Sequence, residues 1–198
     1  MGLKYQYWDD LYSSKRTGWD MGSVSTPLKE YFDQIKNKKL KILVPGAGKA
    51  WEAEYLFQNG FRNVFILDYS INAIKEFKLR CPQFPDDQIL NHDFFSHNDT
   101  YDLIVEQTFF SSLLPSQRTD YALSVFDKLN IKGKLVGLLF NNEFEFEGPP
   151  YGGNRKEYVQ LFNPYFNIEI LEIAYNSIKP RKGRELFLLL SKNTKLVS

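Results

Sequence analysis

Acidic side chains end three short apolar runs of this sequence. Asp68 follows "NVFIL", Asp93 follows "QILNH", and Glu106 ends "YDLIVE". If these runs are neighbouring strands of an open α/β sheet, their carboxyl ends meet where such sheets bind ligands. A carboxylate there can accept hydrogen bonds from sugar hydroxyls or from an amino group. Each acid alone is equally well explained as a helix cap or a polar rim, but three in succession favour a ligand site.

A glycine turn precedes the first of these acids. The stretch "KILVPGAGKAW" leads from apolar residues through Gly46 and Gly48 toward a helix. Glycines let backbone amides approach a ligand, and Asp68 at the next strand end can bind ribose hydroxyls. A dinucleotide turn needs a third glycine beside the pyrophosphate, and Trp51 occupies that position. S-adenosylmethionine carries no phosphate and tolerates a side chain there. The turn therefore favours S-adenosylmethionine over NAD or FAD, although a tight turn without a ligand remains open for this stretch alone.

Alternating strands and helices must position these residues. Short apolar runs predict strands covered on both faces: Ile42–Val44, Val64–Leu67, Gln88–Asn91, Leu103–Glu106 and Leu135–Phe140, then a terminal pair, Ile168–Ile173 and Leu186–Leu190. The predicted helices are Tyr5–Ser13, a segment starting after Ser25 and Thr26, Trp51–Asn59, Ile71–Arg80 capped by Ser70, a segment after Pro115, and Lys156–Phe162. The connection 94–100 is too short for a helix and should run nearly extended.

This alternation predicts the fold class. We expect a single α/β domain over residues 1–198, with a Rossmann-like, doubly wound, three-layer α/β/α architecture. The sheet should be mostly parallel, with an antiparallel C-terminal edge strand.

The composition indicates which classes of partner and which cellular compartment to expect. The net charge is +1, which gives no electrostatic case for a nucleic-acid or membrane-surface partner. Cys81 is the one cysteine, so an intrachain disulfide is impossible and a reducing cytosol fits. With neither a leader pattern nor an apolar run of membrane length, we expect a soluble, cytoplasmic protein. His92 and His97 belong to no catalytic motif, and no metal-ligand spacing is present.

Motifs along nearly the whole chain resemble the thiopurine S-methyltransferase family, especially its thiol and halide methyltransferases. The shared stretches, in order, are "WDDLYSSKRTGWDMG", "VPGAGKA", "LDYS", "DFF", "YDLIVEQTFF", "LPSQRTDYA", "GPPYGGNRKEY" and "PRKG". "GWD", "GPPY" and "PRKG" have no role in a generic nucleotide-binding fold, so their order is specific. The resemblance implies a class I methyltransferase fold, in which an N-terminal helical lid, residues 1–38, closes over S-adenosylmethionine. It also implies a monomer.

The resemblance assigns roles residue by residue. The implied cofactor-binding residues are Trp8, Trp19, Pro45, Gly46, Ala47, Gly48, Asp68, Tyr69, Ser70, Asp93, Phe94, Phe95 and Glu106. Among them Asp68 would meet the ribose, Asp93 with Phe94 the adenine, and Glu106 the cofactor's amino group. The implied acceptor-pocket residues are Phe109, Phe110, Arg118, Pro149, Pro150, Tyr151 and Arg181. No catalytic residue is assigned, and Ala47 stands where the family often has cysteine.

The expected reaction transfers a methyl group in line to a small soft nucleophile and leaves S-adenosylhomocysteine. Thiols, sulfide and thiopurine-like rings are the expected acceptors, with halides as further candidates. Positioning can contribute about 7–11 kcal/mol in favourable cases, a dry aromatic wall strips the nucleophile of water, and an arginine lowers the pKa of a thiol.

Two alternatives are an oxidoreductase using the same turn, which Trp51 disfavours, and a non-catalytic S-adenosylmethionine-binding protein. A methyltransferase of the same fold acting on another small molecule is also open.

Overall fold

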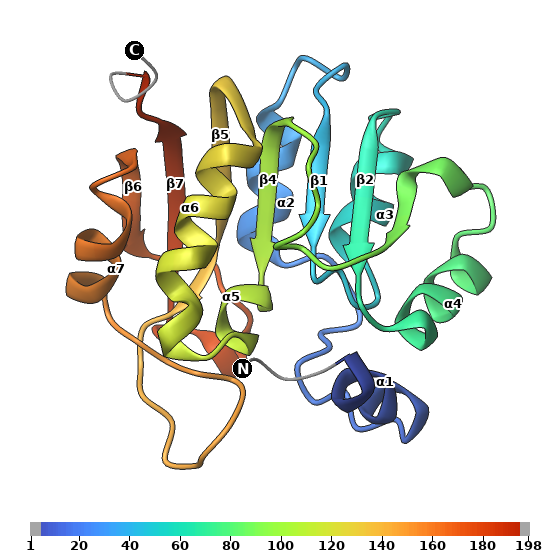
Figure 1. Cartoon of the computed structure of the whole chain (residues 1–198), viewed down its shortest axis with the longest axis horizontal. Helices are drawn as coiled ribbons and strands as arrows, with labels where there is room; N and C mark the ends of the chain where they lie inside the picture. Colours follow the sequence, from blue (N-terminus) through green and yellow to red (C-terminus); the bar gives the residue numbers. More distant parts are fainter. Residues whose placement is uncertain (1–4, 195–198) are drawn as a thin grey trace.

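One seven-stranded sheet organises the chain (Figure 1). The computed structural model describes residues 5–194; residues 1–4 of the predicted lid and residues 195–198 lie outside the described part. The strands are β1 (Ile42–Pro45), β2 (Val64–Asp68), β3 (Ile89–Asn91), β4 (Tyr101–Gln107), β5 (Leu129–Phe140), β6 (Phe166–Ile173) and β7 (Glu185–Lys192). Their order is β3-β2-β1-β4-β5-β7-β6. The neighbours from β3 to β5 pair in parallel, which confirms the predicted doubly wound sheet.

Helices cover both faces of this sheet. They are α1 (Tyr5–Ser13), α2 (Thr26–Gln34), α3 (Trp51–Gln58), α4 (Ile71–Arg80), α5 (Phe109–Ser112), α6 (Arg118–Lys128) and α7 (Arg155–Phe162). Side chains alternate between the faces of β1, so Leu43 packs with α5, α6 and α7 while Ile42 and Val44 pack with α2, α3 and α4. These two cores confirm the three-layer arrangement.

The terminal strand pair forms the antiparallel edge, in an order that the sequence did not predict. β7 is antiparallel to both of its neighbours, but it lies between β5 and β6, so that β6 is the outermost strand. The apolar run of β7 explains this order: Leu186, Leu188 and Leu190 are almost completely buried, which an inner strand achieves and an edge strand does not. β6, with exposed Ile170 and Ile173, tolerates the edge better.

Local signals fix the ends of the elements near the sheet's carboxyl edge. Ser70 caps α4 by accepting a hydrogen bond from the Ala73 amide at 3.1 Å, as predicted. The connection 94–100 forms no helix; a turn at residues 94–96 opens it, and the rest is irregular. Within residues 5–194, no helix is long and apolar enough to cross a membrane.

Candidate active site

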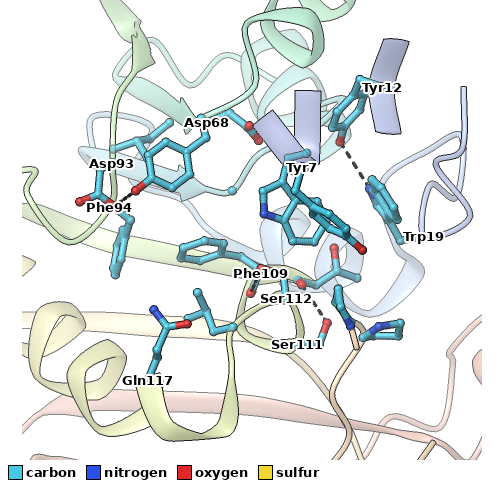
Figure 2. Close-up of a pocket in the computed structure, with 18 of the residues that line it drawn as sticks. Tyr7, Tyr12, Trp19, Asp68, Asp93, Phe94, Phe109, Ser111, Ser112 and Gln117 are labelled. Atoms are coloured by element: carbon cyan, nitrogen blue, oxygen red, sulfur yellow. Dashed lines mark hydrogen bonds between the residues drawn. The ribbon is translucent and has the colours of Figure 1, made fainter. Parts of the chain in front are cut away.

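A cavity of about 710 Å³ opens at the carboxyl ends of the parallel strands (Figure 2). Gly46 follows β1, Asp68 ends β2, Asp93 follows β3 and Thr108 follows β4, and all four line it. The N-terminal segment covers the opposite side. Of the predicted site residues, those on the cavity wall are Trp8, Trp19, Gly46, Asp68, Tyr69, Asp93, Phe94, Phe95, Phe109, Pro149, Pro150 and Arg181. The topology thus brings together most of the residues that the sequence singled out; their contact with a cofactor stays a prediction.

The glycine turn is tied to Asp68. Gly46 and Gly48 have φ of 55° and 54°, the left-handed region that glycine adopts without strain. The Gly48 amide donates to Asp68 Oδ2 at 2.7 Å, and the Ser70 amide donates to Asp68 Oδ1 at 2.8 Å. Burial raises the pKa of Asp68 to about 6, although these amides favour its charged form. Asp68 therefore links the first turn to the second strand and still lines the cavity.

A second acidic corner lies at the end of β3. The Tyr69 hydroxyl donates to Asp93 Oδ1 at 2.6 Å, and the Ser96 amide donates to Oδ2 at 3.0 Å. Partial burial opposes charge here, but these hydrogen bonds prevail and hold the pKa of Asp93 below its ordinary value. Phe94 and Phe109 meet edge to face nearby, with ring centroids 5.2 Å apart. The corner combines a fixed carboxylate with flat apolar walls, a suitable surface for a heteroaromatic ring with an amino group.

The N-terminal segment is anchored on α4 and on the glycine turn. Asp9 of α1 accepts hydrogen bonds from Ser70 Oγ at 2.8 Å and from Asn72 Nδ2 at 2.8 Å. Trp19 packs edge to face on Trp8, with centroids 5.6 Å apart. These contacts place both predicted tryptophans against the cavity.

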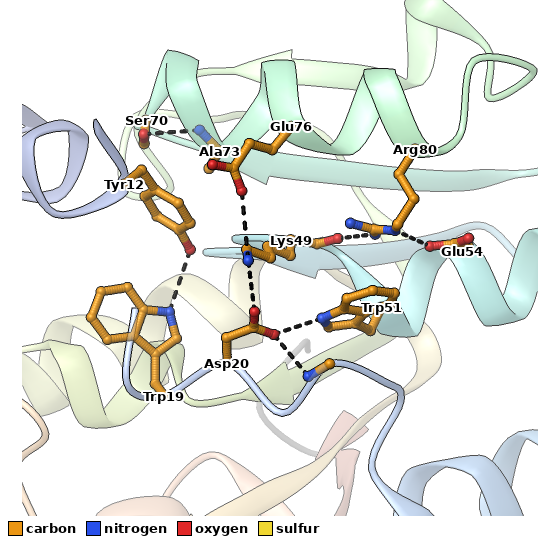
Figure 3. Close-up of polar contacts among 11 residues, drawn as sticks. Tyr12, Trp19, Asp20, Lys49, Trp51, Glu54, Ser70, Ala73, Glu76 and Arg80 are labelled. Carbon is orange, nitrogen blue, oxygen red and sulfur yellow. Dashed lines mark hydrogen bonds and ion pairs between the residues drawn. The ribbon is translucent and has the colours of Figure 1, made fainter. Parts of the chain in front are cut away.

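Asp20 makes the second anchor (Figure 3). It forms an ion pair with Lys49 at 2.8 Å and accepts a hydrogen bond from Trp51 Nε1 at 2.7 Å. The guanidinium of Arg80 lies over the face of the Trp51 ring, 3.7 Å from its centroid. The indole at the third-glycine position therefore joins α3 to the lid segment.

The far end of the cavity is mostly apolar. Leu113, Phe140, Pro149 and Pro150 line it together with the hydroxyls of Ser111 and Ser112. Arg181 is the one arginine or lysine among the described residues that line the cavity. Its guanidinium donates to the Trp19 carbonyl at 2.9 Å and pairs with Glu185 at 3.1 Å. It thus connects the "PRKG" segment to the lid beside the apolar end.

Four predicted site residues that do not line the cavity are Glu106, Phe110, Arg118 and Tyr151. Glu106 is 0% exposed and faces the core, where Tyr121 and the Phe110 amide donate to its carboxylate at 2.7 Å and 2.8 Å. β4 continues one residue past Glu106, so this side chain points into the sheet's face rather than out of its end. Phe110 is likewise buried in the core.

Arg118 and Tyr151 form a structural contact rather than a cavity wall. Arg118 donates to the Gly152 carbonyl at 2.6 Å and lies over the Phe110 ring, 4.8 Å from its centroid. The Tyr151 amide in turn donates to the Ser111 carbonyl at 2.7 Å. The "GPPY" loop is held by these bonds, and its two prolines, not Tyr151, reach the cavity.

The remaining predicted residues surround the turn. Pro45 and Ser70 are buried behind the wall, whereas Ala47 and Gly48 line a smaller adjoining chamber of about 50 Å³. Sequence reasoning did not assign the other residues of that chamber to the site: Tyr12, Asp20, Met21, Ser23, Lys49, Trp51, Glu52, Gln107 and Thr108.

Other wall residues were missed in the main cavity. They are Tyr7, Tyr12, Gly18, Leu67, His92, Thr108, Ser111, Ser112, Leu113, Gln117, Phe140 and Pro180. His92, which belongs to no catalytic motif, also lies on the wall. Proximity to "DFF" and to "TFF" could have indicated His92, Thr108, Ser111 and Ser112, because neighbours of a strand end share its edge. Among residues 5–194, no group of three or more His, Cys, Asp or Glu side chains could hold a metal ion.

Comparisons with known proteins identify the family of this chain. The family profile "Thiopurine S-methyltransferase (TPMT)" matches residues 3–192. "Probable thiol methyltransferase 2" of Arabidopsis thaliana is 27% identical over 185 residues, which cover 90% of this chain and 81% of the relative. "Thiopurine S-methyltransferase" of Acinetobacter baylyi is 22% identical over 206 residues, covering 91% and 94%.

Solved structures share the fold. The Burkholderia thailandensis 1,6-didemethyltoxoflavin-N1-methyltransferase, with bound 1,6-didemethyltoxoflavin and S-adenosylhomocysteine, superposes with a TM-score of 0.77. It is 13% identical, and the match covers 96% of this chain and 87% of that one. The resemblance found in the motifs is confirmed, and the chain belongs to the thiopurine S-methyltransferase family of S-adenosylmethionine-dependent methyltransferases.

Proposed function

We propose that this enzyme transfers a methyl group from S-adenosylmethionine to the sulfur of a small thiol, sulfide or thiopurine-like acceptor. The observation that carries the proposal is the division of the cavity. One half is bounded by the glycine turn, Asp68 and Asp93, and the other is an apolar compartment with Arg181 at its rim. The curated relatives named thiol methyltransferase, thiocyanate methyltransferase and thiopurine S-methyltransferase support sulfur as the acceptor atom.

The residues present fit the cofactor. Asp68 and Asp93 are carboxylates held by backbone or hydroxyl donors, and each has lone pairs left for hydroxyl or amino groups. Trp8, Phe94 and Phe109 provide aromatic faces, which suit both an adenine ring and a sulfonium cation. S-adenosylmethionine, when bound, supplies a methyl group activated by a positively charged sulfur.

The acceptor half would favour a soft anion. Its phenylalanine and proline walls exclude water, so a thiolate entering it loses part of its hydration shell. The guanidinium of Arg181 stabilises negative charge at the rim and so lowers the pKa of a nearby thiol. Halides and thiocyanate carry the same kind of charge and are weaker candidates, because the Ser111 and Ser112 hydroxyls offer hydrogen-bond partners to a larger, polar acceptor.

The direct test measures methylated product. Purified protein is incubated with S-adenosylmethionine and sulfide, thiophenol, an aliphatic thiol, thiocyanate or iodide, and volatile products are measured in the headspace. We expect turnover of at least one thiol, with the thiols preferred to iodide. If none of these nucleophiles is methylated while S-adenosylhomocysteine still binds, the protein binds the cofactor without acting on soft nucleophiles and the proposal is wrong.

A variant pair tests the role of Arg181. Arg181→Met should raise the apparent pKa in the pH profile of kcat for an aliphatic thiol, because kcat reports ionisation of the bound acceptor, and should lower kcat at pH 7 about tenfold, the equivalent of one pKa unit. Arg155→Met is the matched control, because Arg155 is exposed and pairs with Glu172 away from the cavity. An unchanged pH profile in Arg181→Met would remove Arg181 from the acceptor's ionisation.

We also propose that the enzyme is a cytoplasmic monomer without a nucleic-acid partner. The buried free thiol of Cys81 and the net charge of +1 support a reducing compartment and a small-molecule role. Sedimentation of the purified protein and fractionation of cells test the two statements.

A further inference from the structure

The chamber of about 50 Å³ beside the glycine turn is a separate small space that joins the main cavity. Tyr12, Trp19, Gly46 and Thr108 line both, so the two are contiguous around the turn. The chamber could hold one small polar head group or a water molecule, since a single water needs about 10–15 Å³ of such volume. Its walls are mixed, with Glu52 and Gln107 among apolar residues such as Met21 and Trp51, so a polar occupant has specific partners to find.

Two buried side chains on these walls have polar atoms without partners. Glu52, on the first turn of α3, is 5% exposed, and its Oε1 has no hydrogen-bond partner among residues 5–194. At the end of β4, both Oε1 and Nε2 of Gln107 are buried and equally unpartnered within that part of the chain. Leaving such atoms unsatisfied costs about 1–3 kcal/mol each. A ligand that pairs with them removes this cost.

The neighbouring charges are already committed elsewhere (Figure 3). Asp20 is bound by Lys49 and Trp51, and Lys49 lies between Asp20 and Glu76 at 2.8 Å and 3.7 Å. Arg181 is committed to the Trp19 carbonyl and to Glu185, outside the chamber. The Tyr12 hydroxyl accepts from Trp19 at 3.3 Å. Among the side chains of the chamber, Glu52 and Gln107 are therefore the ones that hold buried polar atoms without a partner within residues 5–194.

We propose that Glu52 and Gln107 bind the amino-acid end of S-adenosylmethionine, with Glu52 receiving its α-ammonium group. This inference rests on the proposed use of that cofactor. An ammonium group has three donors, which suit the free carboxylate oxygen of Glu52 and the amide oxygen of Gln107. The amide nitrogen of Gln107 is a donor for the carboxylate of the same zwitterion. Glu52 thus takes the place expected from the sequence for Glu106.

Electrostatics of the chamber agree with a cationic partner. Burial raises the pKa of Glu52 to about 7, while the nearby backbone amides of Glu52 and Ser25 and the charge of Arg181 act in the opposite direction. Asp20 raises it slightly further. An ammonium group beside Glu52 would favour the ionised carboxylate. Binding should therefore release a proton below about pH 7 and tighten as the pH rises toward 8.

The test compares two ligands that differ only in the amino group. Calorimetry measures the binding of S-adenosylhomocysteine and of its deamino analogue to the wild type, Glu52→Gln and Gln107→Leu. We expect the wild type to prefer S-adenosylhomocysteine about 10- to 100-fold, the range for a hydrogen-bonded charge. Glu52→Gln should lose most of this preference through weaker binding of S-adenosylhomocysteine alone. Glu30→Gln is the matched control, because Glu30 is an exposed acid of α2 that contacts Tyr175.

Each outcome decides between the ligand role and a structural one. Equal binding of both ligands to the wild type overturns the inference without any variant. An equal loss for both ligands in Glu52→Gln also overturns it, since that pattern indicates a role in folding of the turn. If the wild type binds neither ligand, the proposed function fails together with the inference. If it binds both equally, only the inference fails.

Discussion

Replacing Glu106 by glutamine should make the protein more stable at neutral pH. The Glu106 carboxyl is completely buried, and burial raises its pKa from 4.5 to about 7 despite hydrogen bonds from Phe110 and Tyr121. Glutamine has the same shape as the protonated acid. Its carbonyl can accept from the Phe110 amide, and its NH₂ can donate to the Tyr121 hydroxyl, so the hydrogen bonds of the neutral state are kept.

The magnitude follows from proton linkage. The folded state binds the Glu106 proton more tightly than the unfolded chain does, so its contribution to stability is complete below pH 4.5 and is lost as the pH rises to about 7. A difference between 4.5 and 7 corresponds to about 3 kcal/mol in total, of which about 2–3 kcal/mol falls between pH 5 and pH 8. Glutamine does not titrate, so Glu106→Gln should escape this loss.

Urea unfolding at pH 5 and pH 8 tests this reasoning. At pH 8 the midpoint of Glu106→Gln should exceed that of the wild type by about 1 M, because m is about 2–3 kcal/mol/M in urea. At pH 5 the two midpoints should nearly coincide. Glu30→Gln, which changes an exposed acid in the same way, is the control. The same difference between Glu106→Gln and the wild type at both pH values would refute the claim that ionisation of Glu106 opposes folding.

Three further changes probe the walls of the site. Asp20→Asn removes the ion pair with Lys49 and should weaken S-adenosylhomocysteine binding about 5-fold, or ~1 kcal/mol, by calorimetry; unchanged affinity would show that this anchor is irrelevant to the cofactor. Arg118→Lys loses the guanidinium bond to the "GPPY" loop and should lower Tm by about 2–6 °C in scanning calorimetry, with cofactor affinity nearly kept if the role is structural. Gly48→Ala forces a positive φ on alanine and drives its Cβ into the Tyr12 hydroxyl, so stability should fall by at least ~1–2 kcal/mol in urea; a neutral result would mean that the lid simply moves aside.

The acids at the strand ends show what sequence could predict. Asp68 and Asp93 were correctly placed beside the cavity because Asp68 ends one strand and Asp93 closely follows another, and the carboxyl ends of parallel strands meet at one edge. For Glu106 the prediction was wrong, because the predicted strand ended one residue too early. β4 runs to Gln107, and the two-residue period of a strand turns Glu106 toward the core and Gln107 toward the glycine turn. Sequence alone does not locate a strand end to that precision.

Long-range polar contacts were beyond prediction for a different reason. Asp9 and Asp20 look like ordinary surface acids, and nothing local marks Ser70, Asn72 or Trp51 as their partners. The same holds for Arg118, whose position at the start of α6 does not reveal which way its long side chain points. A motif indicated that this arginine belongs to the family's pattern, but only the packed loop shows that its guanidinium holds backbone carbonyls.

The first turn of α3 contacts both the lid segment, through Trp51, and the adjoining chamber, through Glu52. Trp51 argued against a dinucleotide because it fills the space of a third glycine, and the structure shows that its ring nitrogen also binds Asp20 of the lid segment. Lys49 binds the same carboxylate from the other side, while Glu52, one residue after Trp51, faces the adjoining chamber. A ligand that favours the ionised carboxylate of Glu52 therefore binds the same turn of α3 that holds the lid segment through Trp51. We therefore expect cofactor binding and closure of the lid to be coupled through Lys49, Trp51 and Glu52. If so, the effects of Asp20→Asn and Glu52→Gln on S-adenosylhomocysteine affinity should be non-additive.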